Sequence, residues 1–184
     1  VLNLANNHIM DYYEKGLIDT IETLKKHDIL YCGAGENIGE ARNPAVLNVK
    51  GVNVLVLGYT DMAEYFYKGN PMISFEAGEQ KSGVAPRKLE YIKEDIEKIR
   101  EEADIIIISL HWGVEDSFEV TDEQREFAYE LIDLGADIIL GHHAHKFQGV
   151  EIYNGKPIIY SMGNFIFDQN DPLKQESFIV DMAF

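Results

Sequence analysis

The stretch ADIIIISLHWG, residues 103–113, decides the fold of this chain. Four isoleucines lead through Ser109 and Leu110 to His111. A short apolar run of this kind is typical of a strand that is buried on both faces of a parallel sheet. A histidine that follows such a strand lies at the carboxyl edge of the sheet, where open α/β folds build their sites. The stretch therefore predicts a buried strand that presents an imidazole to a functional site.

Two other apolar segments, residues 1–5 and 137–140, end in residues of the same chemical kind. Any single histidine at a strand end is more often a polar cap or an exposed loop residue. Three strand ends that bring imidazole and amide groups to one edge of a sheet favour a metal site instead. The candidate metal ligands are Asn7, His111, His143 and His145.

The rest of the chain alternates helical and strand patterns. Apolar residues recur at helical spacing in three segments, and a capping box of Thr121 and Gln124 opens the third. This alternation predicts a mixed α/β fold with both faces of the sheet covered. We expect helices at 15–26, 86–99 and 121–135, strands at 1–5, 29–32, 104–110, 137–140 and 178–184, hairpins at 45–59 and 150–161, a turn at 33–35 and a long loop at 60–84.

Composition narrows the classes of partner. The chain has 184 residues, which suits one domain over 1–184. Its 16 Lys and Arg against 32 Asp and Glu give a formal charge of −16. Such a field repels nucleic acid, and an anionic small molecule or polymer would have to be drawn in by bound cations. No apolar run approaches the roughly 18 to 20 residues of a membrane-spanning helix, and the lone Cys32 forms no intramolecular disulfide.

His8 has a different expected role from the metal ligands. Asn7 would give its side-chain oxygen to a metal, while His8 would point at the leaving group of a substrate and protonate it as a general acid. Asp11, three residues on, either receives the other ring nitrogen and orients the ring or caps the following helix. The two roles of Asp11 do not exclude each other, and the sequence favours neither.

Three further residues are weaker candidates. If the backbone is extended, His143 and His145 point the same way and His142 points away from them, so we expect His142 to support the site without binding the metal. Glu115 could reach the pocket. Asn164 could hydrogen-bond a ligand or a metal-binding histidine, although a plain turn is the commoner explanation of that segment.

At these motifs the chain resembles the capsule-synthesis CapA, or poly-γ-glutamate synthesis (PGA_cap), proteins, a branch of the calcineurin-like metallophosphoesterase superfamily. The likeness rests on residues 3–8 with Asp11, 109–113, 141–145 and 161–168. It implies a β-sandwich flanked by helices (αββα) with two divalent metal ions, Mn, Fe, Zn or Mg, at the strand ends. It also implies that Asn7, His111, His143 and His145 are the metal-ligand positions and His8 is the catalytic histidine.

The resemblance also implies carboxylate motifs that should lie before the Asn-His motif. We therefore expect the domain to lack its N-terminal strands, either because the chain is a piece of a longer protein or because it is a partial domain with an incomplete site. Alone, it should bind at most one divalent ion, weakly, and hydrolyse phosphate esters at little above background. Glu115 and Asp168 are the first carboxylates to test as internal substitutes.

Two functions follow from the resemblance. The first is a metal-dependent phosphoesterase associated with bacterial capsule or poly-γ-glutamate synthesis. The alternative is a non-catalytic component that binds or anchors the polymer in a surface-export machinery. Either would act with capsule-synthesis partners at the cell surface, or at the membrane through segments outside this chain.

Overall fold

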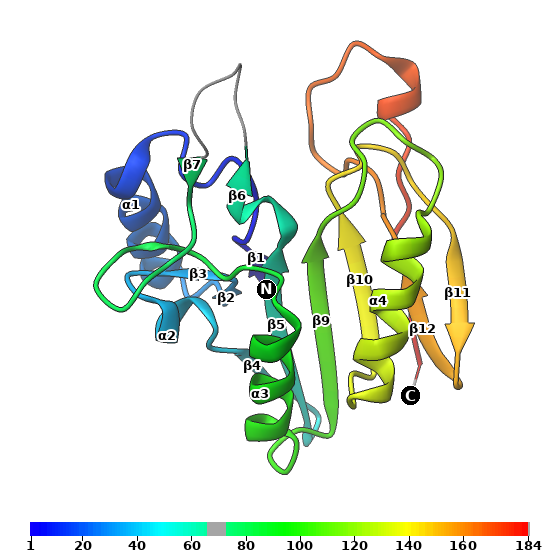
Figure 1. The fold of residues 1–184 in the computed structure, drawn as a ribbon, viewed down its shortest axis with the longest axis horizontal. Helices are drawn as coiled ribbons and strands as arrows, with labels where there is room; N and C mark the ends of the chain where they lie inside the picture. Colours follow the sequence, from blue (N-terminus) through cyan, green and yellow to red (C-terminus); the bar gives the residue numbers. More distant parts are fainter. Residues whose placement is uncertain (66–72, 184) are drawn as a thin grey trace.

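A six-stranded mixed sheet forms the centre of the protein (Figure 1). The computed structural model describes residues 1–65 and 73–183. The four inner strands run parallel, and an antiparallel hairpin partner closes each edge. In spatial order the strands are β11 (Val150–Tyr153), β12 (Lys156–Ile159), β10 (Ile138–His142), β9 (Ile105–His111), β5 (Val52–Thr60) and β4 (Ala45–Val49).

Two helices, α3 (Leu89–Ile99) and α4 (Asp122–Asp133), cover one face of this sheet (Figure 1). Alternate side chains of β9, such as Ile106 and Ile108, are buried beneath them in the main core. The predicted capping box is present at the start of α4, where the Thr121 and Gln124 side chains each bond the other's backbone N–H. The mixed α/β fold with helices flanking a central sheet is confirmed.

Most of the remaining elements form a second group around α1 (Tyr13–Lys26), which lies apart from the main sheet in Figure 1. Three two-stranded sheets and a short helix belong to this group. Leu17, Ile21 and Leu24 of α1 pack into a separate small core. The elements are β1 (Leu2–Asn3) with β2 (Tyr31–Cys32), β3 (Ala34–Gly35) with β8 (Gly83–Val84), β6 (Glu64–Tyr65) with β7 (Ile73–Ser74), and α2 (Ile38–Ala41).

Several sequence expectations are corrected. The first strand has only two residues, and Val1 and Leu2 are exposed, because β1 pairs with β2 outside the main sheet. The expected turn at 33–35 instead contains β3, which pairs with β8. The expected strand at 178–184 is wrong for residues 178–183, which form no strand; residue 184 lies outside the described residues. Part of the expected loop at 60–84, residues 66–72, also lies outside them.

The face of the sheet opposite α3 and α4 is only partly covered. Cys32 of β2 packs against Val56 there. A pocket of about 540 Å³ remains, lined by apolar side chains that include Leu47, Val54 and Ile107, with Ser109 and His142 at one end. The open face therefore leads to the strand ends that carry the histidines.

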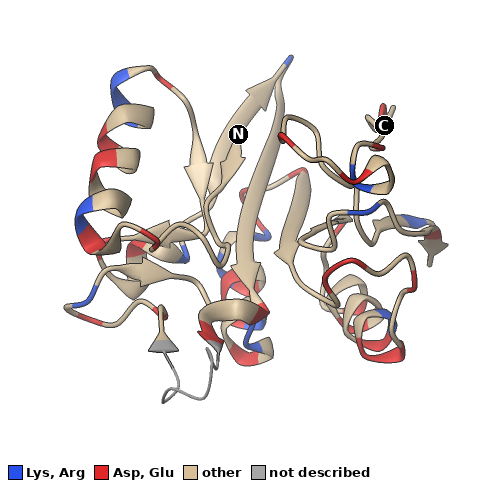
Figure 2. Ribbon diagram, turned by 90° about the horizontal axis from the view of Figure 1, so that it is seen from above, with Lys and Arg blue, Asp and Glu red and all other residues tan. Residues whose placement is uncertain are grey.

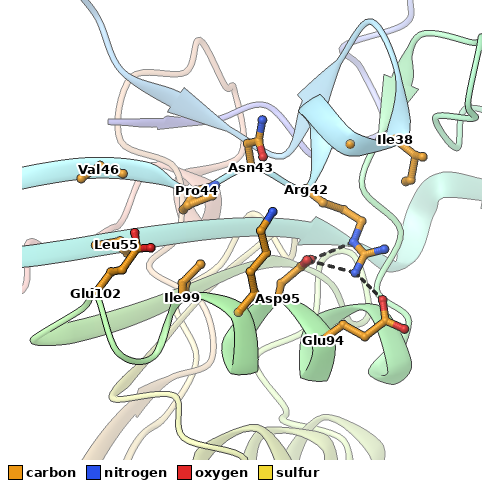
Figure 3. A pocket seen from close by; sticks show the side chains of 12 residues that line it. Ile38, Arg42, Asn43, Pro44, Val46, Leu55, Glu94, Asp95, Ile99 and Glu102 are labelled. Atoms are coloured by element: carbon orange, nitrogen blue, oxygen red, sulfur yellow. Dashed lines mark hydrogen bonds and ion pairs between the residues drawn. The ribbon is translucent and has the colours of Figure 1, made fainter.

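A buried ion pair ties α2 to α3 at the edge of a separate pocket of about 440 Å³ (Figure 3). Arg42 follows α2, and its Nε and Nη2 atoms donate to the two Asp95 oxygens at 2.8 and 3.0 Å. The Tyr59 hydroxyl donates to Asp95 Oδ2 at 2.8 Å, and Glu94 accepts a further bond from Arg42 at 2.9 Å. Every charge in this cluster has a partner, so we regard it as structural.

Charged residues lie mainly on the helices and loops, while the long strands are uncharged over most of their length (Figure 2). This distribution follows from the burial of the sheet. None of the helices in the described ranges has both the length and the apolar character needed to cross a membrane.

Candidate metal centre

The strand register brings the histidines together. In the parallel pair β9 and β10, His111 lies directly opposite His142 at the carboxyl edge of the sheet. His143 follows β10 at once, and its ring centroid lies 4.6 Å from that of His111. Asn7 reaches the same point from a segment more than one hundred positions away in the sequence. The prediction that these strand ends converge agrees with this geometry.

Three polar atoms meet at the centre of the cluster. His111 Nε2 lies 2.9 Å from Asn7 Oδ1 and 2.9 Å from His143 Nδ1. Ligands of a tetrahedral zinc ion with bonds of about 2.1 Å lie about 3.4 Å apart, so a shift of roughly half an ångström would admit a metal. The donor set of two imidazoles and an amide oxygen therefore fits a divalent ion of borderline hardness.

The set is incomplete as it stands. Across residues 1–65 and 73–183, no three His, Cys, Asp or Glu side chains are already arranged to hold a metal ion. His145 lies beside the central group, with its ring centroid 6.5 Å from that of His143. Its Nε2 atom is 3.6 Å from Glu115 Oε1. His145 and Glu115 are thus additional donors beside the central group.

The backbone of this segment is not extended, which corrects the alternation argument for His142 to His145. His143 has φ of 101° and His145 has φ of 57°, both in the left-handed region. The turn lets the strand residue His142 contact His111 from one side while His143 contacts it from the other.

Asn164 orients His145. Its amide Nδ2 donates to the Lys174 carbonyl at 3.0 Å, so its Oδ1 must face the His145 ring, where it accepts from Nδ1 at 2.8 Å. The proton of neutral His145 is therefore on Nδ1, and the Nε2 lone pair is free to bind a ligand.

The loop that carries His8 is shaped by its neighbours. Asn6 Oδ1 accepts from the backbone N–H groups of His8 and Ile9, both at 2.9 Å. His8 Nδ1 lies 2.9 Å from Asp11 Oδ2, and both side chains are more than half exposed. The helix-capping alternative for Asp11 is wrong, because α1 has Tyr12 at its N-cap and no side-chain cap bond.

The buried imidazoles are neutral. Burial, reinforced by the His142 and His143 rings, lowers the pKa of His111 to about 2. Burial and His143 lower the pKa of His142 to about 4. Burial also lowers the pKa of His143, although Glu115 opposes this. A metal ligand must offer a lone pair, and neutral rings do so without losing a proton to solvent.

Sequence reasoning missed three residues at this edge. Asn3 and Ser109 both contact His142 Nε2, at 3.0 and 3.2 Å. Asp61 directly follows β5, and its Oδ2 accepts from the Gly113 backbone N–H at 3.0 Å. The only signal for Ser109 was a polar residue inside an apolar run. Asp168 is exposed, and no contact among the described residues joins it to the cluster.

These features define a class of mixed α/β protein with a histidine-rich edge that fits a divalent metal. A crystal structure of a putative 5'-nucleotidase from Staphylococcus aureus, in complex with alpha-ketoglutarate, shares the fold with a TM-score of 0.56. The alignment covers 84% of this chain and 31% of that one at 21% identity, so it is evidence for the fold alone.

The family model for the bacterial capsule synthesis protein PGA_cap matches residues 1–169, and the chain belongs to this family. The PGA biosynthesis protein CapA of Bacillus subtilis is 39% identical over 98% of this chain, and the capsule biosynthesis protein CapA of Bacillus anthracis is 37% identical over 98%. A probable polyglutamine synthesis accessory protein of Mycobacterium tuberculosis is 32% identical over 97%. The chain spans less than half of each relative, between 43% and 48%.

Proposed function

We propose that this chain forms the metal-binding part of a phosphoesterase-type hydrolase that serves capsule or poly-γ-glutamate synthesis. The proposal is carried by the approach of Asn7 Oδ1 and His143 Nδ1 to His111 Nε2, each at 2.9 Å. The names of the relatives support the pathway. Two bound divalent ions, of Mn, Fe, Zn or Mg, would supply activation of a water molecule and neutralisation of charge on the phosphate group.

Different residues of the chain would bind the two ions. Neutral His111 and His143, with Asn7, would hold the first ion. His145, oriented by Asn164, would hold the second ion together with a carboxylate, and Glu115, 3.6 Å from His145 Nε2, is the candidate for it.

His8 would protonate the leaving oxygen as a general acid. Its exposure lets a substrate approach, and the Asp11 carboxylate holds its other ring nitrogen. The net charge of −16 makes bound cations necessary for attracting an anionic substrate.

The experiment is metal analysis combined with hydrolysis of an aryl phosphate diester and monoester. We expect His143→Ala to lower both metal content and turnover. His27→Ala is the matched control, because His27 is exposed at the end of α1, far in the sequence from the cluster. Equal metal content in the two variants would refute the assignment of His143 as a ligand.

A second candidate function is supported by the incomplete donor set within residues 1–65 and 73–183. In this alternative the protein is a non-catalytic component that uses the same pocket to bind an anionic polymer, such as polyglutamate, at the export machinery. Metal-dependent binding of polyglutamate without hydrolysis of either phosphate ester would favour this alternative over the enzyme.

A further inference from the structure

Three consecutive apolar side chains are displayed on the loop that follows Asn164. Phe165 is 73% exposed, Ile166 88% and Phe167 56%. A single apolar residue on a protein surface is ordinary, whereas three in succession are unusual unless they serve a function. Contiguous exposed apolar surface of this kind marks a place where a ligand or partner binds. The run from 165 to 167 is therefore a candidate binding surface.

Hydrogen bonds hold the loop on both sides of this run. On one side, Asn164 Nδ2 donates to the Lys174 carbonyl at 3.0 Å. On the other side, the Gln175 side chain donates to the Gln169 carbonyl at 2.6 Å. None of the three apolar side chains belongs to the cores that the described residues form. The run thus projects from an anchored segment and does not close a core.

The loop meets the candidate metal centre twice, each time at His145. Asn164 Oδ1 accepts from His145 Nδ1 at 2.8 Å immediately before the run. At the end of the run, the ring centroid of Phe167 lies 5.4 Å from that of His145. His145 Nε2 lies on the side of Glu115 Oε1, at 3.6 Å. The apolar run is therefore part of the rim of the metal centre.

The surrounding charge distinguishes between two kinds of apolar partner. Anionic bilayers attract basic segments, but Asp168 follows the run directly and is exposed, and the chain has a formal charge of −16. A lipid surface therefore suits this loop poorly. A small molecule with an anionic end and an apolar end suits it well, because the donors of the metal centre and the apolar run adjoin at His145.

We propose that Phe165, Ile166 and Phe167 bind an apolar group of the substrate, so that the preferred substrate is a phosphate ester with an apolar or aromatic substituent. The inference deepens the proposed function, because it rests on a phosphate group binding at the metal centre. With the phosphate group at the ions, the substituent would pack against Phe167. Aromatic rings in contact gain stability beyond the burial of their area, which gives an aromatic substituent an advantage over an alkyl group.

The test is calorimetric binding of phenylphosphonate and methylphosphonate to the Zn²⁺-loaded protein. The two probes have the same anionic group and a carbon–phosphorus bond that a phosphoesterase does not cleave, so they differ only in the apolar group. Phenylphosphonate should bind about tenfold more tightly. Equal affinity for the two phosphonates, or no binding of either, would overturn the proposal.

Variants assign the preference to the loop. Phe167→Ala should lower the affinity for phenylphosphonate by about fivefold to tenfold and leave the affinity for methylphosphonate unchanged. Phe167→Tyr keeps the ring and should restore the preference. Ile152→Ala is the control, because Ile152 is 65% exposed on β11. Equal effects of Phe167→Ala and Ile152→Ala, or an equal loss of both phosphonates in Phe167→Ala, would count against the proposal.

Other results separate this inference from its alternatives. Binding to vesicles of phosphatidylglycerol and phosphatidylcholine that is lost in Phe167→Ala, with no preference for phenylphosphonate, would assign the run to a membrane and overturn the proposal. A preference for phenylphosphonate that is lost in Phe167→Ala, in a protein that hydrolyses no phosphate ester, would support the inference and refute the enzyme. Hydrolysis of an aryl phosphate ester with no preference between the phosphonates would support the enzyme and refute the inference.

Discussion

We expect Asp95→Ala to remove about 3 to 5 kcal/mol from the free energy of unfolding, because it leaves the Arg42 guanidinium without its bidentate partner. Both side chains are largely buried, with 17% of Arg42 and 12% of Asp95 exposed. Burial opposes the charge on Arg42, yet its hydrogen bonds to Asp95 and Glu94 raise its pKa. A domain of this size has a total stability of roughly 5 to 15 kcal/mol, so the loss should be large.

Tyr59 provides a second substitution that tests the same cluster. Its hydroxyl is buried and donates to Asp95, and burial followed by the neighbouring Asp95 charge raises its pKa. Tyr59→Phe alone should cost about 1.5 to 3 kcal/mol, the contribution of a hydrogen bond to a charged group. In the Asp95→Ala background the same change should cost little, because the hydroxyl has already lost its acceptor.

The assay is urea unfolding of the four proteins in this double-mutant cycle, followed by circular dichroism. Glu97→Ala on the same helix is the control. Its ion pair with Lys93 is 4.0 Å long and exposed, so it should contribute less than about 1 kcal/mol. Additive losses for Asp95→Ala and Tyr59→Phe, or a loss at Asp95 no larger than at Glu97, would refute the reasoning.

Three other substitutions test the site and its edge. Gly58→Ala should cost about 1 to 3 kcal/mol by overpacking, since its Cβ would lie 2.4 Å from Asn3 Oδ1; an unchanged urea midpoint would contradict this. Burial, opposed by a backbone hydrogen bond, raises the pKa of Asp61 above 3.8. A carboxyl whose pKa is higher in the folded than in the unfolded state stabilises the fold at acidic pH. This stabilisation is lost as the pH rises through the folded-state pKa. Asp61→Asn should therefore raise the melting temperature at pH 7 more than at pH 4, and an equal change at both would disprove it. Asp11→Asn should lower turnover with metal content unchanged, whereas His143→Ala should remove metal; equal depletion in both would be inconsistent with their separate roles.

The central sheet could be predicted because its signals are local. The isoleucine run of β9 and the helical spacing in α3 and α4 each define an element without reference to the rest of the chain. The two-residue strands β3 and β8 could not be predicted, because such short bridges have no periodicity and exist only through tertiary pairing.

The sequence indicated which residue types form the candidate site but not how their side chains are arranged. Histidines after two buried strands indicated a common edge, and the register of β9 and β10 agrees with it. The hydrogen bond between Asn3 and Ser109 joins residues 106 positions apart, and no local sequence pattern indicates such a contact. The left-handed backbone at His143 and His145 also has no local signal, because residues other than glycine are uncommon in that region.

That backbone has a consequence for how the protein can change over time. A non-glycine residue held in the left-handed region costs on the order of 1 to 3 kcal/mol, and His143 and His145 both lie there. Glycine or asparagine at either position would relieve the strain and make the fold more robust while removing an imidazole. A lineage released from selection for the metal site should therefore lose these two histidines early, and a stabilised variant selected for heat resistance alone should lose them as well.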